Sequence, residues 1–297
     1  MKKGRNLRSV NTDGGVNLQF KLLSAIGIII IVSGHCYHGG MELAYNWFPP
    51  YSYNLALFVF ISGYFYKTDY EENVGKYIWK RTKRLLIPAY LWNIFYGGVV
   101  AFLGLFGFTI GAKPDLYNLF VMPFVDGEAF QYNLGSWFVY PLFLVCIINV
   151  LFRKFLKLIH LDNEFIVLIV YLAIGMIGIN TAIENQTAIN GIVKLLVRTM
   201  FFLPCYEFGR FYKAVLEKKD TLNNVAYFAI IFAVQLILLT FCKDLEYTPS
   251  SFTKFNNGFI IPYISSITAI AFWLRVSRLL VPAIGNSKLV RLIADNT

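Results

Sequence analysis

His35 is the residue of this sequence whose type and position most directly suggest chemistry. It closes a run of small and apolar residues, 22–34, that suits a membrane-spanning helix. An ionisable side chain in such a place is energetically costly, so it indicates a functional site. Histidine also titrates near neutral pH, which suits it to proton transfer. The alternative is a histidine that is wetted at the bilayer interface and has no catalytic role.

Two further polar residues precede His35 on the same helix. Residues 11 apart turn through about 1,100°, so Ser24 and His35 share one face at depths about 16 Å apart. Lys21 lies one turn below Ser24 on nearly the same face, about 21 Å from His35. The helix therefore carries a stripe of Lys21, Ser24 and His35. The alternative for Lys21 is an anchor whose ammonium group extends to the membrane surface.

A basic pair stands at the start of the third apolar segment. Arg81 and Arg84 are three residues apart, so they occupy neighbouring positions on a helix. The planar guanidinium fork suits phosphate oxygens. The competing explanation is strong, because basic clusters at such helix starts often meet lipid headgroups and set topology.

The sixth apolar segment is unusually polar. Lys194 and Arg198 are i, i+4 neighbours in one half, and Glu207 and Arg210 are i, i+3 neighbours near the other end. We expect Glu207 and Arg210 to form an ion pair, and this helix to face a polar interior. Arg198 is a candidate for binding an anionic acceptor or an oxyanion. A structural ion network within the bundle is an equal alternative.

The elements that must position these residues follow from composition. The chain has 297 residues, of which 57% are hydrophobic, 18% are aromatic and only 15% are charged. This charged share lies well below the usual quarter. The composition predicts one all-α domain over residues 1–297, a polytopic transmembrane helix bundle. Apolar or aromatic-rich segments occur at residues 20–37, 53–66, 85–108, 134–152, 165–183, 192–209, 223–242 and 258–280. We therefore predict about eight spans, with the second short and the sixth polar.

The distribution of charge predicts the orientation. With a cytoplasmic N-terminus, 22 of the 27 Lys and Arg residues fall in inner segments. Lys113, Lys243 and Lys254 lie in outer loops, and Lys194 and Arg198 lie inside the sixth span. This asymmetry follows the positive-inside rule. The net charge of +10 therefore reports topology in a multi-pass cell-membrane protein, with membrane lipid contact as a secondary effect and no nucleic-acid partner. The four cysteines are scattered, and we expect no metal.

Four blocks, in order, resemble the integral-membrane acyltransferase-3 family, which O-acylates cell-envelope sugars. The first is the end of the opening helix, Val32-Ser33-Gly34-His35. The second is an aromatic run closed by a Ser-Gly-aromatic sequence, Ala56-Leu57-Phe58-Val59-Phe60-Ile61-Ser62-Gly63-Tyr64-Phe65. The third is similar to an Arg-x-x-Arg-Leu-x-x-Pro segment, Lys80-Arg81-Thr82-Lys83-Arg84-Leu85-Leu86-Ile87-Pro88. The fourth resembles a Phe-x-Pro-Phe-x-x-x-Gly helix, Phe201-Phe202-Leu203-Pro204-Cys205-Tyr206-Glu207-Phe208-Gly209.

The resemblance implies an acyl-CoA-dependent O-acyltransferase of the cell envelope. The donor is acyl-CoA, most simply acetyl-CoA, and the acceptor is a hydroxyl of an envelope or exopolysaccharide glycan or of a lipid-linked sugar. His35 is then the general base or forms a covalent acyl-histidine, and the sequence leaves both open. Arg81 and Arg84 would bind CoA phosphates at the inner mouth. Ser62 and Gly63 suit close helix approach better than nucleophilic catalysis, because no triad partner is placed by spacing.

Two departures from the family pattern bear on these expectations. The family usually places an Arg eleven residues before the helix-one His, where this chain has Ser24; Lys21 is then the candidate substitute at the donor site. The family also usually continues beyond the Gly-x-x-Ser block of residues 284–287, so we expect the last helix to be missing. The alternative functions are a polytopic transporter or glycan-lipid flippase, whose inverted repeats and broken helices are not found, or a truncated inactive remnant.

Overall fold

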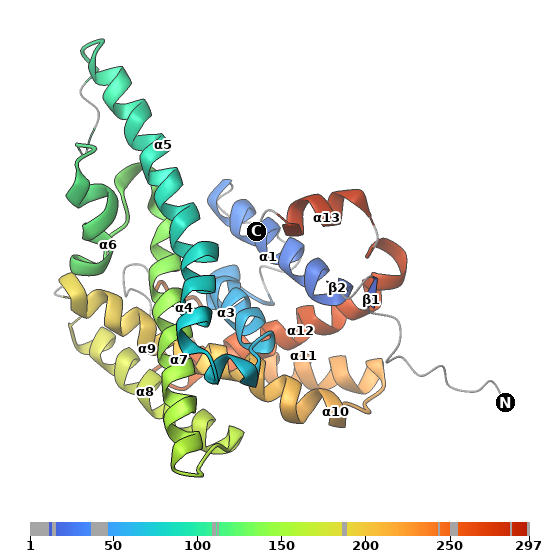
Figure 1. The fold of residues 1–297 in the computed structure, drawn as a ribbon. Coiled ribbons are helices and arrows are strands. Elements are labelled where there is room, and N and C mark those ends of the chain that lie inside the picture. Colours follow the sequence, from blue (N-terminus) through green and yellow to red (C-terminus); the bar gives the residue numbers. More distant parts are fainter. Residues whose placement is uncertain are drawn as a thin grey trace.

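The computed structural model describes residues 12–13, 16–36, 47–108, 111, 113–185, 189–242, 244–249, 255–285 and 287–295. Lys243 and Lys254, two of the three outer-loop lysines, lie outside these ranges. The described residues form a helix bundle preceded by a two-stranded antiparallel hairpin, β1 (Thr12–Asp13) and β2 (Val16–Asn17), in which Thr12 pairs with Asn17. The predicted all-α class is confirmed (Figure 1).

All eight predicted spans coincide with helices. They are α1 (Leu18–Cys36), α3 (Asn54–Tyr64), α5 (Ile87–Gly104), α7 (Val139–Leu158), α8 (Glu164–Asn185), α9 (Gly191–Phe211), α11 (Asn224–Phe241) and α12 (Ile261–Ile284). Among the described residues, six helical segments are long and apolar enough to cross a membrane. The second span was predicted to be short and the sixth to be polar. In the structure α3 is short and apolar, and α9 is long but carries too many charges to be among the six.

Shorter helical elements connect these spans. They are η2 (Pro50–Ser52), η3 (Thr68–Glu71), α4 (Val74–Arg81), η4 (Thr82–Leu86), η5 (Tyr117–Val121), α6 (Met122–Val125), η6 (Gln131–Phe138), η8 (Tyr212–Leu216), α10 (Glu217–Lys219) and α13 (Lys288–Asp295). The third span differs from its prediction at its start, because α4, the π-turn η4 and α5 form one helical segment of 31 residues. The side chain of Asn73 caps this segment by accepting from the backbone N–H of Lys76.

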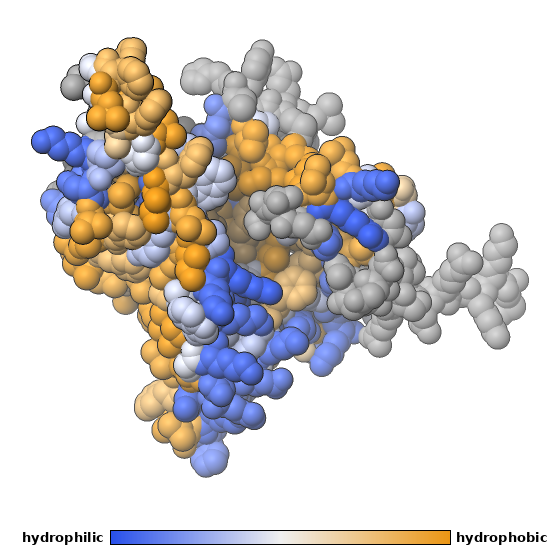
Figure 2. All heavy atoms as spheres, turned by 45° about the horizontal axis from the view of Figure 1, so that its top comes forward, coloured by the Kyte–Doolittle hydropathy of each residue, from blue (hydrophilic) through white to orange (hydrophobic). Residues whose placement is uncertain are grey.

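The apolar exterior and the polar groups are segregated. Figure 2 shows apolar side chains over much of the left of the face, where Figure 1 places α5, and hydrophilic side chains gathered beside them in the lower middle. On α5 the residues Leu91, Trp92 and Phe95 are each more than half exposed. Such a surface suits contact with lipid chains rather than with water.

The predicted inner segments meet at one end of the bundle. Gln19 donates to the carbonyl of Leu274, and Tyr64 donates to Glu217. Arg153 contacts Asp162, and Lys157 approaches Glu71. We call this the basic end, made of residues 17–19, 66–73, 153–164, 210–222 and 274–278. The predicted outer loops, which include residues 126–133 and 244–249, meet at the opposite end, which we call the loop end.

Candidate functional site

The second and fourth family-like blocks pack directly against each other. A Cβ atom at Gly63 of α3 would overlap the backbone carbonyl oxygen of Tyr206 on α9, and one at Gly209 would overlap the carbonyl of Phe60. The two glycines therefore allow the backbones of α3 and α9 to touch. This contact agrees with the expectation that Gly63 serves close helix approach.

Ser62 and Arg81 lie at the two ends of a buried polar cluster between these helices. Ser62 Oγ is 3.9 Å from Cys146 Sγ on α7. The hydroxyls of Tyr77 and Tyr206 are 3.4 Å apart, and Arg81 Nε donates to Tyr77 at 3.0 Å. The third block thus joins the α3–α9 contact through a tyrosine.

The three candidate donor-binding residues occupy different environments. Arg81 is half-buried and also lies over the ring of Tyr77, at 5.2 Å. Arg84 is exposed on η4, one turn further along. Lys21 is half-buried near the start of α1, as is Ser24. The structure therefore does not bring the three cations into one contact cluster.

The predicted Glu207–Arg210 ion pair is wrong. Both carboxylate oxygens of Glu207 accept from Arg153 Nη2 on α7, at 2.8 and 2.7 Å. Arg210 pairs instead with Glu164 at the start of α8, which also accepts from Arg153 at 2.7 Å. Side chains at i, i+3 can meet, but Arg153 offers its charge from inside the bundle, where Glu207 is fully buried.

Arg198 and Lys194 hold the loop end together. The buried Arg198 donates to the backbone carbonyls of Pro249 and Gly127 and lies over the ring of Trp137, 4.5 Å from its centre. Lys194 forms an ion pair with Glu128. These contacts favour the structural alternative for both residues, since their charged groups are directed at the protein's own loops.

His35 lies in the last turn of α1, and its side chain is exposed. The hydroxyl of Tyr51 donates to the carbonyl of the preceding residue, Gly34, at 3.2 Å. This bond satisfies one of the last four carbonyls of the helix, which lack partners within it. The turn that carries His35 is thus anchored to the segment before α3.

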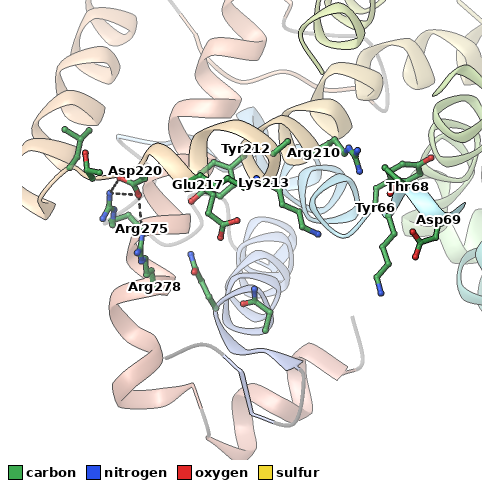
Figure 3. Close-up of a pocket in the computed structure, with 17 residues that line it drawn as sticks. Tyr66, Thr68, Asp69, Arg210, Tyr212, Lys213, Glu217, Asp220, Arg275 and Arg278 are labelled. Atoms are coloured by element: carbon green, nitrogen blue, oxygen red, sulfur yellow. Dashed lines mark hydrogen bonds and ion pairs between the residues drawn. The ribbon is translucent and has the colours of Figure 1, made fainter. Parts of the chain in front are cut away.

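A cavity of about 1140 Å³ opens at the basic end. Six basic and three acidic side chains line it, so its charge is positive on balance: Lys67, Arg210, Lys213, Lys218, Arg275 and Arg278, with Asp69, Glu217 and Asp220. Figure 3 shows Tyr66 and Arg210 at one side, Lys213 and Glu217 in the middle, and Asp220 bonded to Arg275 and Arg278 at the other side. The described lining does not include Lys21, Arg81 or Arg84.

The pKa values of Lys213 and Glu71, both at this end, are shifted. Partial burial lowers the pKa of Lys213, and the neighbouring Arg210 charge lowers it further. Burial raises the pKa of the Glu71 carboxyl, although the hydrogen bond donated by Tyr66 acts in the opposite direction and lowers it. An anion in the cavity would offset the burial cost of the Lys213 charge, so the cavity favours negatively charged ligands.

Several residues of this end escaped the sequence reasoning. In the sequence, Arg153 and the cavity cations other than Arg210 contribute only to the positive-inside asymmetry, and Glu164 carries no signal of a site. These residues come together only through the packing of α7, α8, α9 and α12, and residue spacing along the sequence does not predict that packing. Within the described residues, no group of three or more His, Cys, Asp or Glu side chains is arranged to hold a metal ion.

A comparison with known families completes this description. Residues 17–297 match the acyltransferase-3 family, whose description is an acyltransferase domain. No curated protein and no solved structure matches the chain. The matched region includes the four blocks and the six apolar membrane-spanning segments. The chain therefore belongs to the acyltransferase-3 family and is a multi-pass membrane acyltransferase.

Proposed function

We propose that this protein transfers an acyl group, most simply acetyl, from acyl-CoA to a hydroxyl of a cell-envelope or exopolysaccharide sugar. The observation that carries the proposal is the positively charged cavity at the basic end, in a chain that belongs to an acyltransferase family. Acyl-CoA is an acyl donor rich in phosphate, and clustered Arg and Lys side chains are the groups that bind phosphate in proteins.

The basic end faces the cytoplasm in this proposal, where acyl-CoA is made. The positive-inside distribution of Lys and Arg supports that side for the N-terminus. The donor phosphates enter the cavity, and its cations neutralise them. Exposed Arg84, on η4 one turn beyond Arg81, is a further candidate phosphate contact outside the cavity lining. Arg81 reaches the cavity wall indirectly, because Tyr77 packs against the cavity-lining Tyr66 with ring centres 6.0 Å apart.

His35 is the proposed general base. The helix rise places it about 24 Å from the cavity-lining Gln19 along α1, at the opposite end of the helix. The imidazole accepts the proton of the acceptor hydroxyl while the oxygen attacks the thioester carbonyl. The carbon–sulfur bond then breaks, and the CoA sulfur leaves with the electron pair and takes up a proton. A base in this role contributes about 10²–10⁴-fold to the rate.

An acyl-histidine route uses the same residue differently. The neutral imidazole attacks the thioester, the thiolate leaves, and the acceptor hydroxyl then takes the acyl group from nitrogen. An acyl-protein that accumulates without acceptor and disappears on its addition would identify this route.

The test uses purified protein in lipid nanodiscs with radiolabelled acyl-CoAs and a panel of envelope glycans. We expect acceptor-dependent release of CoA thiol and labelled glycan from the wild type, and neither from His35→Gln. Release of thiol without any acyl transfer, or glycan movement without thiol release, would overturn the proposal; the second result would favour a flippase. Normal turnover by well-folded His35→Gln would remove the proposed base.

A further inference from the structure

Arg210 differs from the other arginines of the cavity in the geometry of its pairing. Arg275 spans both carboxylate oxygens of Asp220 at 2.7 and 2.9 Å, and Arg278 binds the same carboxylate. Arg210 uses its Nε and Nη2 atoms on one oxygen, Oε1 of Glu164, at 3.0 and 2.9 Å. No partner of its Nη1 group is found among the residues that the structure describes. Arg210 therefore keeps N–H donors available at the cavity, as does Arg278, which uses only its Nη1 on Asp220; Arg210 is the one whose carboxylate partner is also bound by the buried Arg153.

The guanidinium of Arg210 also lies over the ring of Tyr66. Arg210 Cζ lies 5.2 Å from the ring centre, and Arg153 Cζ lies 5.8 Å from the same ring. Tyr66 itself is buried and donates to Glu71 at 3.2 Å. The cation–π contact and the ion pair leave Arg210 little freedom to reorient.

Glu164 is in turn held by charges from inside the bundle. Its second oxygen accepts from Arg153, and Arg153 is clamped by Glu207. The side chains of Arg153 and Glu207 are 0% exposed, whereas those of Glu164 and Arg210 are 21% and 13% exposed. The network thus runs from a dry interior to the cavity, and it ends on Arg210.

We propose that Arg210 binds a phosphate group of the acyl-CoA donor and that Glu164 is the positioning residue that presents it. This inference rests on the donor site proposed above and names its phosphate contact. A guanidinium held on one edge by a carboxylate and on one face by a ring is preorganised to bind phosphate with its remaining N–H groups. Neither residue needs to contact the reacting atoms.

Two donors separate this role from a general structural one. Acetyl-CoA carries phosphates, and S-acetylpantetheine carries the same thioester without them. We expect Arg210→Ala to raise the KM for acetyl-CoA and the Kd for CoA roughly 10–100-fold, the range of a charge-assisted contact. The KM for S-acetylpantetheine should stay at the wild-type value. Arg210→Lys should recover part of the loss, because lysine keeps the charge but lacks the fork.

The positioning role predicts the same selectivity for Glu164→Gln, with a smaller effect on the CoA Kd. Arg153 retains Glu207 in that variant, so its charge stays compensated. Glu184→Gln is the matched control, since Glu184 lies exposed near the other end of α8 and bonds only to Asn180 among the described residues. We expect the control to bind CoA normally.

The outcomes distinguish this inference from the proposed function. A wild-type protein that fails to bind CoA contradicts the donor site itself. A wild type that binds CoA, with Arg210→Ala binding equally well, overturns the inference alone. An equal loss of activity with acetyl-CoA and with S-acetylpantetheine would mean that the ion network stabilises the fold and does not bind the donor, which would also overturn the inference. Loss of phosphatidylglycerol-dependent thermal stabilisation in Arg210→Ala, with unchanged CoA binding, would assign Arg210 to a lipid phosphate and also overturn it.

Discussion

Gly63 on α3 lies so close to Tyr206 on α9 that a Cβ atom at Gly63 would overlap the Tyr206 carbonyl oxygen. The clash is with backbone, so no rotamer change can relieve it. Since α3 carries Ser62 and α9 carries Glu207, this contact sets the spacing of both the polar cluster and the ion network.

We predict that Gly63→Ala lowers the free energy of unfolding by about 1–3 kcal/mol, the usual range for overpacking a core. Gly98→Ala on α5 is the control, because nothing lies within 4 Å of a Cβ atom there. That change should be neutral or slightly stabilising. Thermal unfolding of both variants in the same detergent measures the difference, and equal melting temperatures would contradict the close contact.

A second prediction concerns orientation. Lys76 lies exposed three residues beyond the last basic-end residue of its segment, Asn73, and Lys113 lies exposed in a predicted outer loop. In a cysteine-free background, Lys76→Cys should resist an impermeant thiol reagent in intact cells, and Lys113→Cys should react. Permeabilised cells provide the control for reactivity. The reverse pattern would invert the topology and place the cavity outside.

The third prediction concerns Arg84, whose guanidinium is exposed. If it contacts a donor phosphate, Arg84→Ala should raise the KM for acyl-CoA about 10–100-fold and leave the KM for the acceptor nearly unchanged. Lys83→Ala removes a neighbouring exposed cation that lies over the Trp79 ring, so it controls for the general loss of charge. Donor KM values that match between these two variants would assign Arg84 to lipid anchoring.

The sequence allowed the eight helices to be predicted because each has a local signal. Apolar length identified α1, α5, α7, α8, α11 and α12, a shorter apolar and aromatic-rich run identified α3, and charge content identified α9 as a helix facing protein. The join of α4 to α5 through η4 was missed, since the span was predicted to begin with the apolar residues after the basic pair Arg81 and Arg84, whereas the helical segment begins at Val74. The orientation remains a prediction.

The candidate site was less predictable, for a physical reason. The Glu207 carboxylate was visible in the sequence, but its partner Arg153 is 54 positions away and is brought to it by the packing of α7 on α9. The cavity combines α1, η8 and α12 in the same way. His35 needed only its position at the end of an apolar helix, so it could be proposed from sequence, and its catalytic role remains a proposal.

The fourth prediction tests whether Lys21 replaces the arginine that the family usually has at the position of Ser24 on α1. Lys21 and Ser24 are both half-buried on α1, three residues apart. Lys21→Ala should cut activity sharply, and adding Ser24→Arg should restore part of it, because position 24 is in line with His35. Steady-state rates of both single variants and of the double variant decide the point. Full activity of Lys21→Ala would show that no cation is needed there.

The last prediction uses the pH dependence of donor binding. Lys213 lines the cavity, and burial together with the Arg210 charge lowers its pKa below the ordinary value of 10.5. Lys213 is charged below its pKa and loses the charge as pH rises through it. The phosphates of CoA are already fully ionised above neutral pH. The affinity for CoA should therefore decline with rising pH before 10.5 is reached. Lys213→Arg should reduce the decline, because arginine stays protonated at that position.

Titration calorimetry of CoA from pH 7 upwards measures this effect without turnover. Lys213→Met should bind weakly at every pH and show a smaller decline than the wild type, since position 213 then carries no titrating charge. Lys219→Met, a change at an exposed lysine of α10 outside the cavity lining, should keep the wild-type profile. A wild-type affinity that is flat up to pH 10.5 would mean that the Lys213 charge does not contribute to holding the donor.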